Sequence, residues 1–254
     1  MASSTDHFKG KSAVAHIIEA QARGLIAASE IHGTEIPGSL SAGMDAARET
    51  VIVLLLLNLL AAEWIGTVPL LNLWLIFLFG WLIWKTGRSA WLGWSRLERL
   101  HRILEEERWE IEHNREQERE ELRILYAAKG FEGQLLEDVL DVLMADGDRL
   151  LKVMVEEELG LSLEAYEHPL KQGLGAAIGV SAAALLSLAG FWLWPAGGLY
   201  AMAVLILSLS ASLSAHYQGN RLIPSIVWNI GLTFLAGGAA YFLLHYFLNQ
   251  GWLS

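Results

Sequence analysis

The sequence predicts an all-α polytopic membrane protein, with five transmembrane helices and a three-helix insert between the second and third spans. Two observations indicate this fold class: 54% of the 254 residues are hydrophobic, yet the formal net charge is −10. A chain combines both properties when apolar residues and charges occupy separate segments. The hydrophobicity excludes a disordered chain, the absence of cysteine excludes a disulfide scaffold, and the acidic balance argues against a nucleic-acid partner.

The first apolar region predicts a transmembrane hairpin over residues 46–86. Residues 51–84 contain a single charged side chain, that of Glu63. This stretch is too long for one span, because about 20 helical residues cross the ~30 Å hydrocarbon layer. Gly66 and Pro69 interrupt it, and glycine and proline together are typical of a turn. We therefore expect helices over 46–65 and 68–86.

The second apolar region, residues 173–250, predicts three more spans. Turn residues at 195–198 and 216–221 separate helices expected over 173–194, 197–216 and 223–248. Soluble core helices seldom run past about 20 residues without a charge, so repeated stretches of this length favour a membrane. The small-residue runs 175–179 and 237–240 are suited to close helix packing.

The basic residues predict the orientation. With the N-terminus and the insert on one side, that side carries all 18 Lys and Arg residues, Arg221 included. Because basic loops remain in the cytoplasm, we expect a cytoplasmic N-terminus and insert, and a C-terminus outside or in a lumen. We expect a bacterial inner membrane rather than a vacuole.

The N-terminal segment, residues 1–45, lacks the apolar core of a signal peptide. It predicts an amphipathic helix on the cytoplasmic surface. Its apolar face consists of Val14, Ile17, Ile18 and Leu25. Five polar residues of this region are either ligands or ordinary solvated side chains: His16, Glu19, Glu30, His32 and Glu35.

The acidic insert, residues 87–172, carries most of the net charge. Residues 96–126 contain neither proline nor glycine, so we expect one uninterrupted helix that ends before Gly130. Further helices are expected over about 131–145 and 149–159, the latter ending at Gly160.

Helical angles separate the glutamates of the first insert helix into two groups. At ~100° per residue, Glu105, Glu112 and Glu116 lie opposite the apolar stripe. Four other glutamates share or border that stripe, as two ExxE pairs: Glu107 and Glu110, then Glu118 and Glu121. Buried carboxylates need compensation, which a divalent cation bound between neighbouring turns would supply. Ion pairs with Arg102, Arg108 or Arg149 are the alternative.

Two residues of the third insert helix add to this pattern. Met154 and Glu158 present a thioether and a carboxylate at i,i+4, which favours a transition metal such as Fe²⁺, although a helical Met is by itself more often a core residue. The ExxH motifs Glu98–His101 and Glu110–His113 are typical of di-iron bundles. Those sites need two helices, whereas we expect both motifs on one helix, out of phase, so an oxidase site is not expected.

These motifs resemble the vacuolar iron transporter family and its bacterial relatives. The resemblance covers about residues 85–250 and is most specific over 107–161, where the ExxE pairs and Met154-x-x-x-Glu158 match the metal-binding insert in order and spacing. It implies that cytoplasmic metal binds to six residues: Glu107, Glu110, Glu118, Glu121, Met154 and Glu158. It also implies a homodimer that exchanges Fe²⁺, and often Mn²⁺, Co²⁺, Ni²⁺ or Zn²⁺, for protons along a path between the protomers, without an organic cofactor.

The first two spans depart from the family pattern. The family has an Asp-Gly pair in the first span and a methionine in the second, and this chain has neither there. Glu49 or Glu63 is a candidate replacement for the aspartate on the transport path, since ionisable residues within spans are functional by default. Both lie near span ends, where a side chain also reaches water.

The first hypothesis is therefore a proton-coupled exporter of divalent transition metals that captures its substrate on the insert. The second is a non-transporting membrane protein whose insert senses or buffers metal. A ferroxidase, the third, conflicts with the helical phase of the ExxH motifs, so we expect no enzyme.

Overall fold

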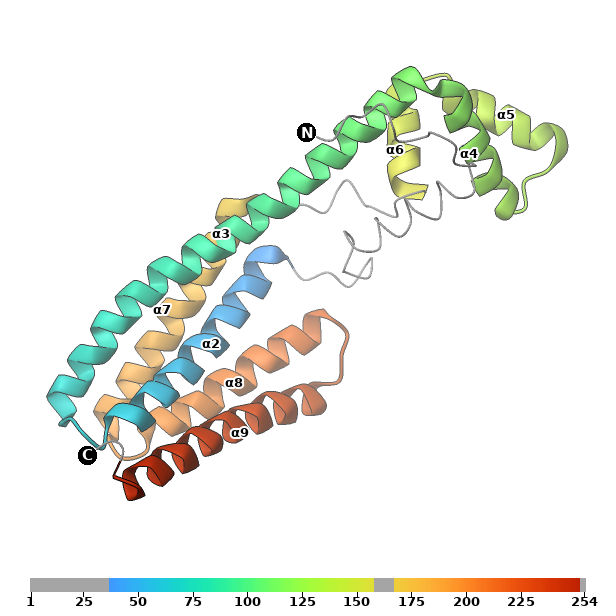
Figure 1. Ribbon diagram of the computed structural model, residues 1–254. Coiled ribbons are helices and arrows are strands. Elements are labelled where there is room, and N and C mark those ends of the chain that lie inside the picture. Colours follow the sequence, from blue (N-terminus) through green and yellow to red (C-terminus); the bar gives the residue numbers. More distant parts are fainter. Residues whose placement is uncertain (1–36, 158–166, 252–254) are drawn as a thin grey trace. The chain divides into compact units, whose positions relative to one another are not determined.

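The computed structural model describes residues 37–157 and 167–251, which form eight helices and no strand (Figure 1). The predicted amphipathic helix of the N-terminal segment lies outside these residues. The described chain divides into two compact units. Residues 37–94 and 167–251 form one, here called the membrane unit, and residues 95–157 form the other, the insert unit.

The membrane unit contains the predicted apolar helices, with shifted ends. The first, α2 (Gly38–Ala61), begins eight residues before the predicted start at 46, because the polar residues that precede the apolar run are also helical. The second, α3 (Thr67–His113), does not end near residue 86 but continues into the insert unit. The last three follow the prediction closely: α7 (Pro169–Leu193), α8 (Gly198–Tyr217) and α9 (Leu222–Asn249).

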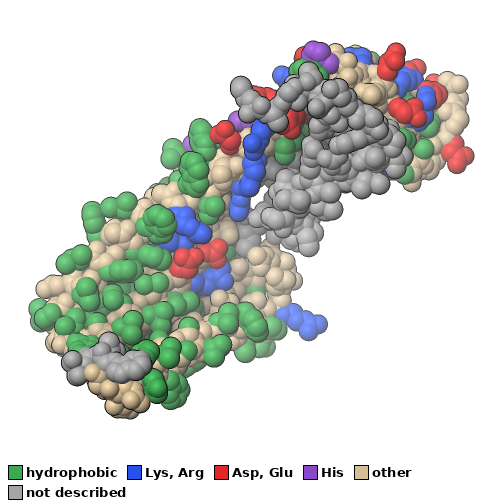
Figure 2. Space-filling view, viewed as in Figure 1, with side chains coloured by type: hydrophobic (Ala, Val, Ile, Leu, Met, Phe, Trp, Pro, Cys, Tyr) green, Lys and Arg blue, Asp and Glu red, His purple; other side chains and the backbone are tan. Residues whose placement is uncertain are grey.

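Four of these helices, α3, α7, α8 and α9, are long and apolar enough to cross a membrane. Every 18-residue window of α2 contains Asp45, Arg48 and Glu49, although its second half is apolar. These three charges set α2 apart from the four. Figure 2 shows many hydrophobic side chains spread across the visible surface of the membrane unit.

The helices α2 and α7 pack backbone against backbone in the membrane unit. A Cβ atom added to Gly179 would lie 2.0 Å from the carbonyl oxygen of Gly43, and one added to Gly175 would lie 1.9 Å from that of Ser39. The absence of side chains lets the two backbones touch, which confirms close packing at the run 175–179. The run 237–240 on α9 differs, because Cβ atoms added to Gly237 and Gly238 would meet nothing.

The insert unit contains the end of α3 followed by α4 (Arg115–Ala128), α5 (Gly133–Met144) and α6 (Gly147–Glu157). The prediction of one uninterrupted helix over 96–126 is wrong. Asn114 leaves the helical conformation, with φ −124° and ψ 35°, and α4 begins directly after it. Asparagine competes with helix formation through its short polar side chain, and a search for proline and glycine alone misses such a break.

The core of the insert unit draws apolar side chains from all four helices. Leu100 and Ile111 come from α3, Leu122 from α4, Leu140 from α5 and Met154 from α6. Arg115 on α4 also donates a hydrogen bond to the carbonyl of Met144 at the end of α5. These contacts hold the four helices together, so the segments that carry the acidic motifs share one core.

Candidate metal site

The four glutamates of the ExxE pairs are buried in the insert unit. Their exposed fractions are 6% for Glu107, 6% for Glu110, 0% for Glu118 and 1% for Glu121. By contrast, Glu105, Glu112 and Glu116 are exposed. The angular prediction of which glutamates face the core is therefore confirmed. All four buried residues also take part in polar or electrostatic interactions in the folded chain.

The two pairs lie on different helices, which corrects the expectation that they share one. Glu107 and Glu110 are in the last turns of α3, whereas Glu118 and Glu121 are in the first turns of α4. The break at Asn114 therefore falls between the pairs. Ile111 and Leu122, which follow Glu110 and Glu121 in the sequence, are both core residues. Each pair thus stands at the edge of the same apolar core.

Met154 on α6 is completely buried and belongs to the core that contains Ile111 and Leu122. The structure therefore brings the predicted thioether into the apolar cluster that borders the glutamate pairs. Glu158, the other predicted ligand on this helix, lies outside the described residues. Among the described residues, no group of three or more His, Asp or Glu side chains has the geometry of a formed metal site.

Two of the arginines considered as partners for the glutamates make other contacts. Arg108 approaches Asp148, with 3.4 Å between Nη2 and Oδ1. Arg149 donates a hydrogen bond to the carbonyl of Val142 at 3.0 Å. The third, Arg102, is exposed.

A separate ion-pair network links α4 to α5. Arg119 contacts Glu137 at 2.9 Å and Asp141 at 2.7 Å, and Arg123 contacts Glu137 at 2.8 Å. The hydrogen bond from Arg119 holds the pKa of Glu137 below its usual value, and the same bond raises the pKa of Arg119. Arginines of α4 therefore neutralise acids of α5, away from the buried glutamate pairs.

The two ExxH motifs lie on one helix, as expected. Glu98, His101, Glu110 and His113 all belong to α3. Glu98, His101 and His113 are exposed, and the ring of His113 stacks on Trp109 with centroids 4.4 Å apart. Because one helix does not supply the two facing motifs of a di-iron site, this arrangement agrees with the rejection of an oxidase.

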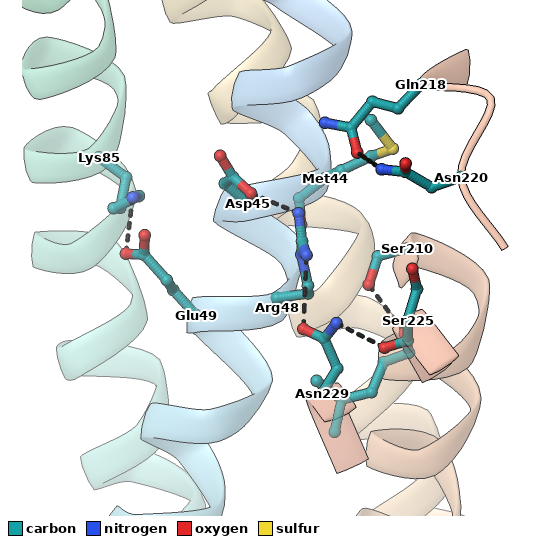
Figure 3. Close-up of polar contacts among 11 residues, drawn as sticks. Met44, Asp45, Arg48, Glu49, Lys85, Ser210, Gln218, Asn220, Ser225 and Asn229 are labelled. Carbon is teal, nitrogen blue, oxygen red and sulfur yellow. Dashed lines mark hydrogen bonds and ion pairs between the residues drawn. The ribbon is translucent and has the colours of Figure 1, made fainter. Parts of the chain in front are cut away.

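In the membrane unit, the two candidate path residues have different surroundings. Glu63 lies in the exposed turn between α2 and α3. Glu49 lies on α2, where its Oε2 atom is 2.6 Å from Nζ of Lys85 on α3 (Figure 3). Sequence reasoning missed this ion pair. The sequence signal for a buried cation was the position of Lys85 directly after an apolar run. The periodicity of one helix does not predict which side chain of another helix it contacts, so the partner could not be identified.

The sequence profile of the VIT family matches residues 91–245. The chain belongs to the VIT family. A vacuolar iron transporter of Acanthamoeba castellanii is 30% identical over 125 residues, which cover 47% of this chain and 47% of that protein. The chain thus spans about half the length of the curated relative that it matches. This membership confirms the predicted resemblance and agrees with the prediction that the chain is not an enzyme.

The VIT match includes the end of α3, the insert unit and helices α7–α9, and it omits α2 and the apolar part of α3. The omitted part is the part where the sequence departs from the family pattern. Together with the four apolar helices, membership in the VIT family identifies an integral membrane protein related to iron transporters.

Proposed function

We propose that this protein exports divalent transition metals, Fe²⁺ above all, from the cytoplasm in exchange for protons. The observation that carries the proposal is the burial of Glu107, Glu110, Glu118 and Glu121 in the insert of a VIT family member. Burying carboxylates of like charge beside an apolar core is unfavourable, and a divalent cation offsets that cost with strong Coulomb attraction. Mn²⁺, Co²⁺ and Zn²⁺ are further candidate substrates.

In this proposal, the insert captures metal on the two glutamate pairs, with Met154 and Glu158 as additional ligands. Capture raises the local concentration of metal available for transport. Thioether and carboxylate ligands together favour a transition metal over Mg²⁺ or Ca²⁺, which prefer oxygen ligands alone. Glu49 is the candidate path residue in the membrane, because it lies within α2, whereas Glu63 lies in an exposed turn.

We further propose that α2 is the fifth span and that the insert is cytoplasmic. Ion pairs of Asp45 with Arg48 and of Glu49 with Lys85 reduce the cost of placing charges near the membrane. The absence of cysteine permits a clean test with single-cysteine variants and a membrane-impermeant thiol reagent. Asn220→Cys should be labelled only after the cytoplasmic face is opened, whereas Trp64→Cys should be labelled from outside.

The protein is proposed to act as a homodimer with the path between protomers. The exposed side of α3 offers a contact surface, because Gly80 and Gly87 have open space around them and Phe79, Ile83 and Trp91 are exposed nearby. Glycine in a span permits close approach of a second helix. Oxidative cross-linking of Gly87→Cys but not of Trp228→Cys on α9 would support this interface.

Transport itself is tested with purified protein in liposomes. We expect Fe²⁺ uptake that requires an opposing pH gradient and stops when a protonophore removes the gradient. Empty liposomes and Gln variants of the four buried glutamates are the controls. Saturable Fe²⁺ binding without flux under any gradient would instead support the second candidate, a membrane protein that senses or buffers metal.

A further inference from the structure

Helix α2 carries two acidic residues, and basic side chains of the same chain neutralise both. The Oδ1 atom of Asp45 lies 2.5 Å from Nη2 of Arg48, and the Oε2 atom of Glu49 lies 2.6 Å from Nζ of Lys85 (Figure 3). Each carboxylate therefore already has a cation beside it before any metal arrives.

The two ion pairs are built differently. Asp45 and Arg48 are three residues apart on one helix, and Arg48 also donates a hydrogen bond to Oδ1 of Asn229 on α9, at 3.4 Å. Glu49 and Lys85 instead connect α2 to α3. The first pair is local and has several partners, whereas the second joins two helices through a single contact between the charged groups.

Burial is unequal within the second pair. Lys85 is 3% exposed, whereas the side chain of Glu49 is 45% exposed. A buried ammonium group needs an anion nearby, because desolvation disfavours its charge. A half-exposed carboxylate has no such requirement and is accessible to other cations. The contact therefore matters more for Lys85 than for Glu49.

Neighbouring side chains hold Lys85 in place. Its Nζ atom lies 6.0 Å from the centroid of the Trp81 ring, within the range of a cation–π interaction. The indole Nε1 of Trp81 donates a hydrogen bond to Oγ1 of Thr50 at 3.0 Å, and Thr50 directly follows Glu49 on α2. This bond fixes the ring that faces the ammonium group, so Lys85 is positioned against the carboxylate.

We propose that Lys85 is a tethered counter-cation that competes with the divalent metal for Glu49. The inference rests on the proposed function and deepens it, because it names the residue that sets the metal affinity of the α2 carboxylate. Metal binding exchanges one cation for another: the ammonium group of Lys85 leaves Oε2 and the metal takes its position. The competition weakens binding, and a transport site must release its ion as well as bind it.

The loss of metal affinity depends on the fraction of time that the ion pair between Glu49 and Lys85 is dissociated, here called the open fraction. The apparent dissociation constant equals the intrinsic one divided by the open fraction. A pair that is open one-tenth of the time therefore weakens metal binding about tenfold. Removing the charge of Lys85 should recover that factor, provided that the carboxylate of Glu49 remains.

The test measures Fe²⁺ binding to the full chain in detergent by anaerobic titration calorimetry. The binding glutamates of the insert are first replaced together, so that only the membrane unit is titrated: Glu107→Gln, Glu110→Gln, Glu118→Gln and Glu121→Gln. In this background, Lys85→Gln should bind Fe²⁺ about tenfold more tightly than the parent. Glu49→Gln and the double variant Glu49→Gln/Lys85→Gln should both lose that binding.

Two further variants separate competition from a structural role. Glu49→Asp retains the carboxylate but shortens its reach toward Lys85, so it should also tighten Fe²⁺ binding, and it serves if Lys85→Gln does not fold. Arg48→Gln removes a different ion pair and should leave the Fe²⁺ affinity of Glu49 unchanged. Unchanged or weaker binding in Lys85→Gln, or tighter binding that persists without Glu49, would overturn the proposal.

The experiments distinguish failure of the proposed function from failure of this inference. If the protein shows no Fe²⁺ flux in liposomes while Lys85→Gln still tightens binding through Glu49, the exporter is wrong and the competition stands. If flux is present and the affinity does not depend on Lys85, the exporter stands and the competition is wrong.

Discussion

The two units of this chain differ in how deeply they bury carboxylates. In the insert unit, four glutamates on α3 and α4 are almost completely buried beside an apolar core. In the membrane unit, the side chains of Asp45 and Glu49 are about half exposed, at 53% and 45%, and each lies against a basic side chain. The most deeply buried of these acids therefore lie in the charged unit and not in the apolar one.

This difference indicates which unit binds a multivalent cation more strongly. A single ammonium or guanidinium group neutralises one carboxylate, and that is sufficient for each acid of α2. Charging four buried carboxylates in one small unit is costly, and a divalent ion or protons compensate that charge most effectively. The contrast therefore predicts tight metal binding in the insert unit and weak, competitive binding in the membrane unit.

Neutralising the buried glutamates should have the largest effect. Changing Glu107, Glu110, Glu118 and Glu121 together to Gln should weaken Fe²⁺ binding to the full chain by more than about 100-fold, since every 1.4 kcal/mol lost is a factor of ten. Titration calorimetry measures the affinity. The matched control changes Glu105, Glu112 and Glu116 to Gln, and it should bind Fe²⁺ like the parent because these side chains are exposed.

The same variant tests the alternative that the glutamates belong to structural ion pairs. Without metal, removal of the buried charges should raise the melting temperature of the chain, because a buried charged carboxylate is costly. Removal of one side of structural ion pairs would lower it instead, by leaving buried cations without compensation. A lower melting temperature with unchanged Fe²⁺ affinity would therefore reject the metal site.

Packing of the membrane unit gives the next largest effect. Gly179→Ala should lower the free energy of unfolding by about 1–3 kcal/mol, since its Cβ would overlap the carbonyl oxygen of Gly43 on α2. Thermal unfolding in detergent measures the loss. Gly237→Ala on α9 is the control and should be neutral, because its Cβ meets no atom. Equal effects would mean that the close contact of α2 with α7 does not hold the unit together.

The sequence predicted the periodic features of this molecule and missed the local ones. Apolar length located the membrane helices, and the 100° helical angle separated buried Glu107 from exposed Glu105. Both features repeat along a helix, so a single sequence contains them. The break at Asn114 depends on one residue, and the contact between Glu49 and Lys85 depends on how two helices pack. Neither leaves a repeating pattern.

A smaller effect is expected from the partly buried ion pairs between α4 and α5. The hydrogen bond from Arg119 lowers the pKa of Glu137, so its contribution to stability is present above the unfolded pKa of that carboxyl and is lost as the pH falls through the lower folded value. Arg119→Gln should reduce the melting temperature of the chain at pH 7 by about 1–3 °C and change it less in acid. A loss of equal size at all pH values would point to packing by the Arg119 side chain instead.

The smallest effect concerns the start of α6, which carries Met154 toward the core. The Oδ1 atom of Asp146 accepts hydrogen bonds from the backbone N–H groups of Arg149 and Asp148, at 3.0 and 2.9 Å. These bonds lower the pKa of Asp146, so the contribution of this cap is present at neutral pH and is lost as the pH falls through the folded pKa. Asp146→Asn should keep the cap, since asparagine caps helices as well as aspartate does. The contribution of the cap to stability should then no longer decrease as the pH falls.

Asp146→Ala should instead lose the cap at every pH. Melting temperatures of the two variants and the parent, measured between pH 3 and pH 7, distinguish the carboxylate charge from the hydrogen-bond acceptor. Because α6 contributes Met154 and Val155 to the insert core, a frayed first turn should also weaken Fe²⁺ binding slightly in Asp146→Ala and leave it intact in Asp146→Asn. Equal Fe²⁺ affinity in both variants would show that the metal-binding pairs on α3 and α4 do not depend on how α6 begins.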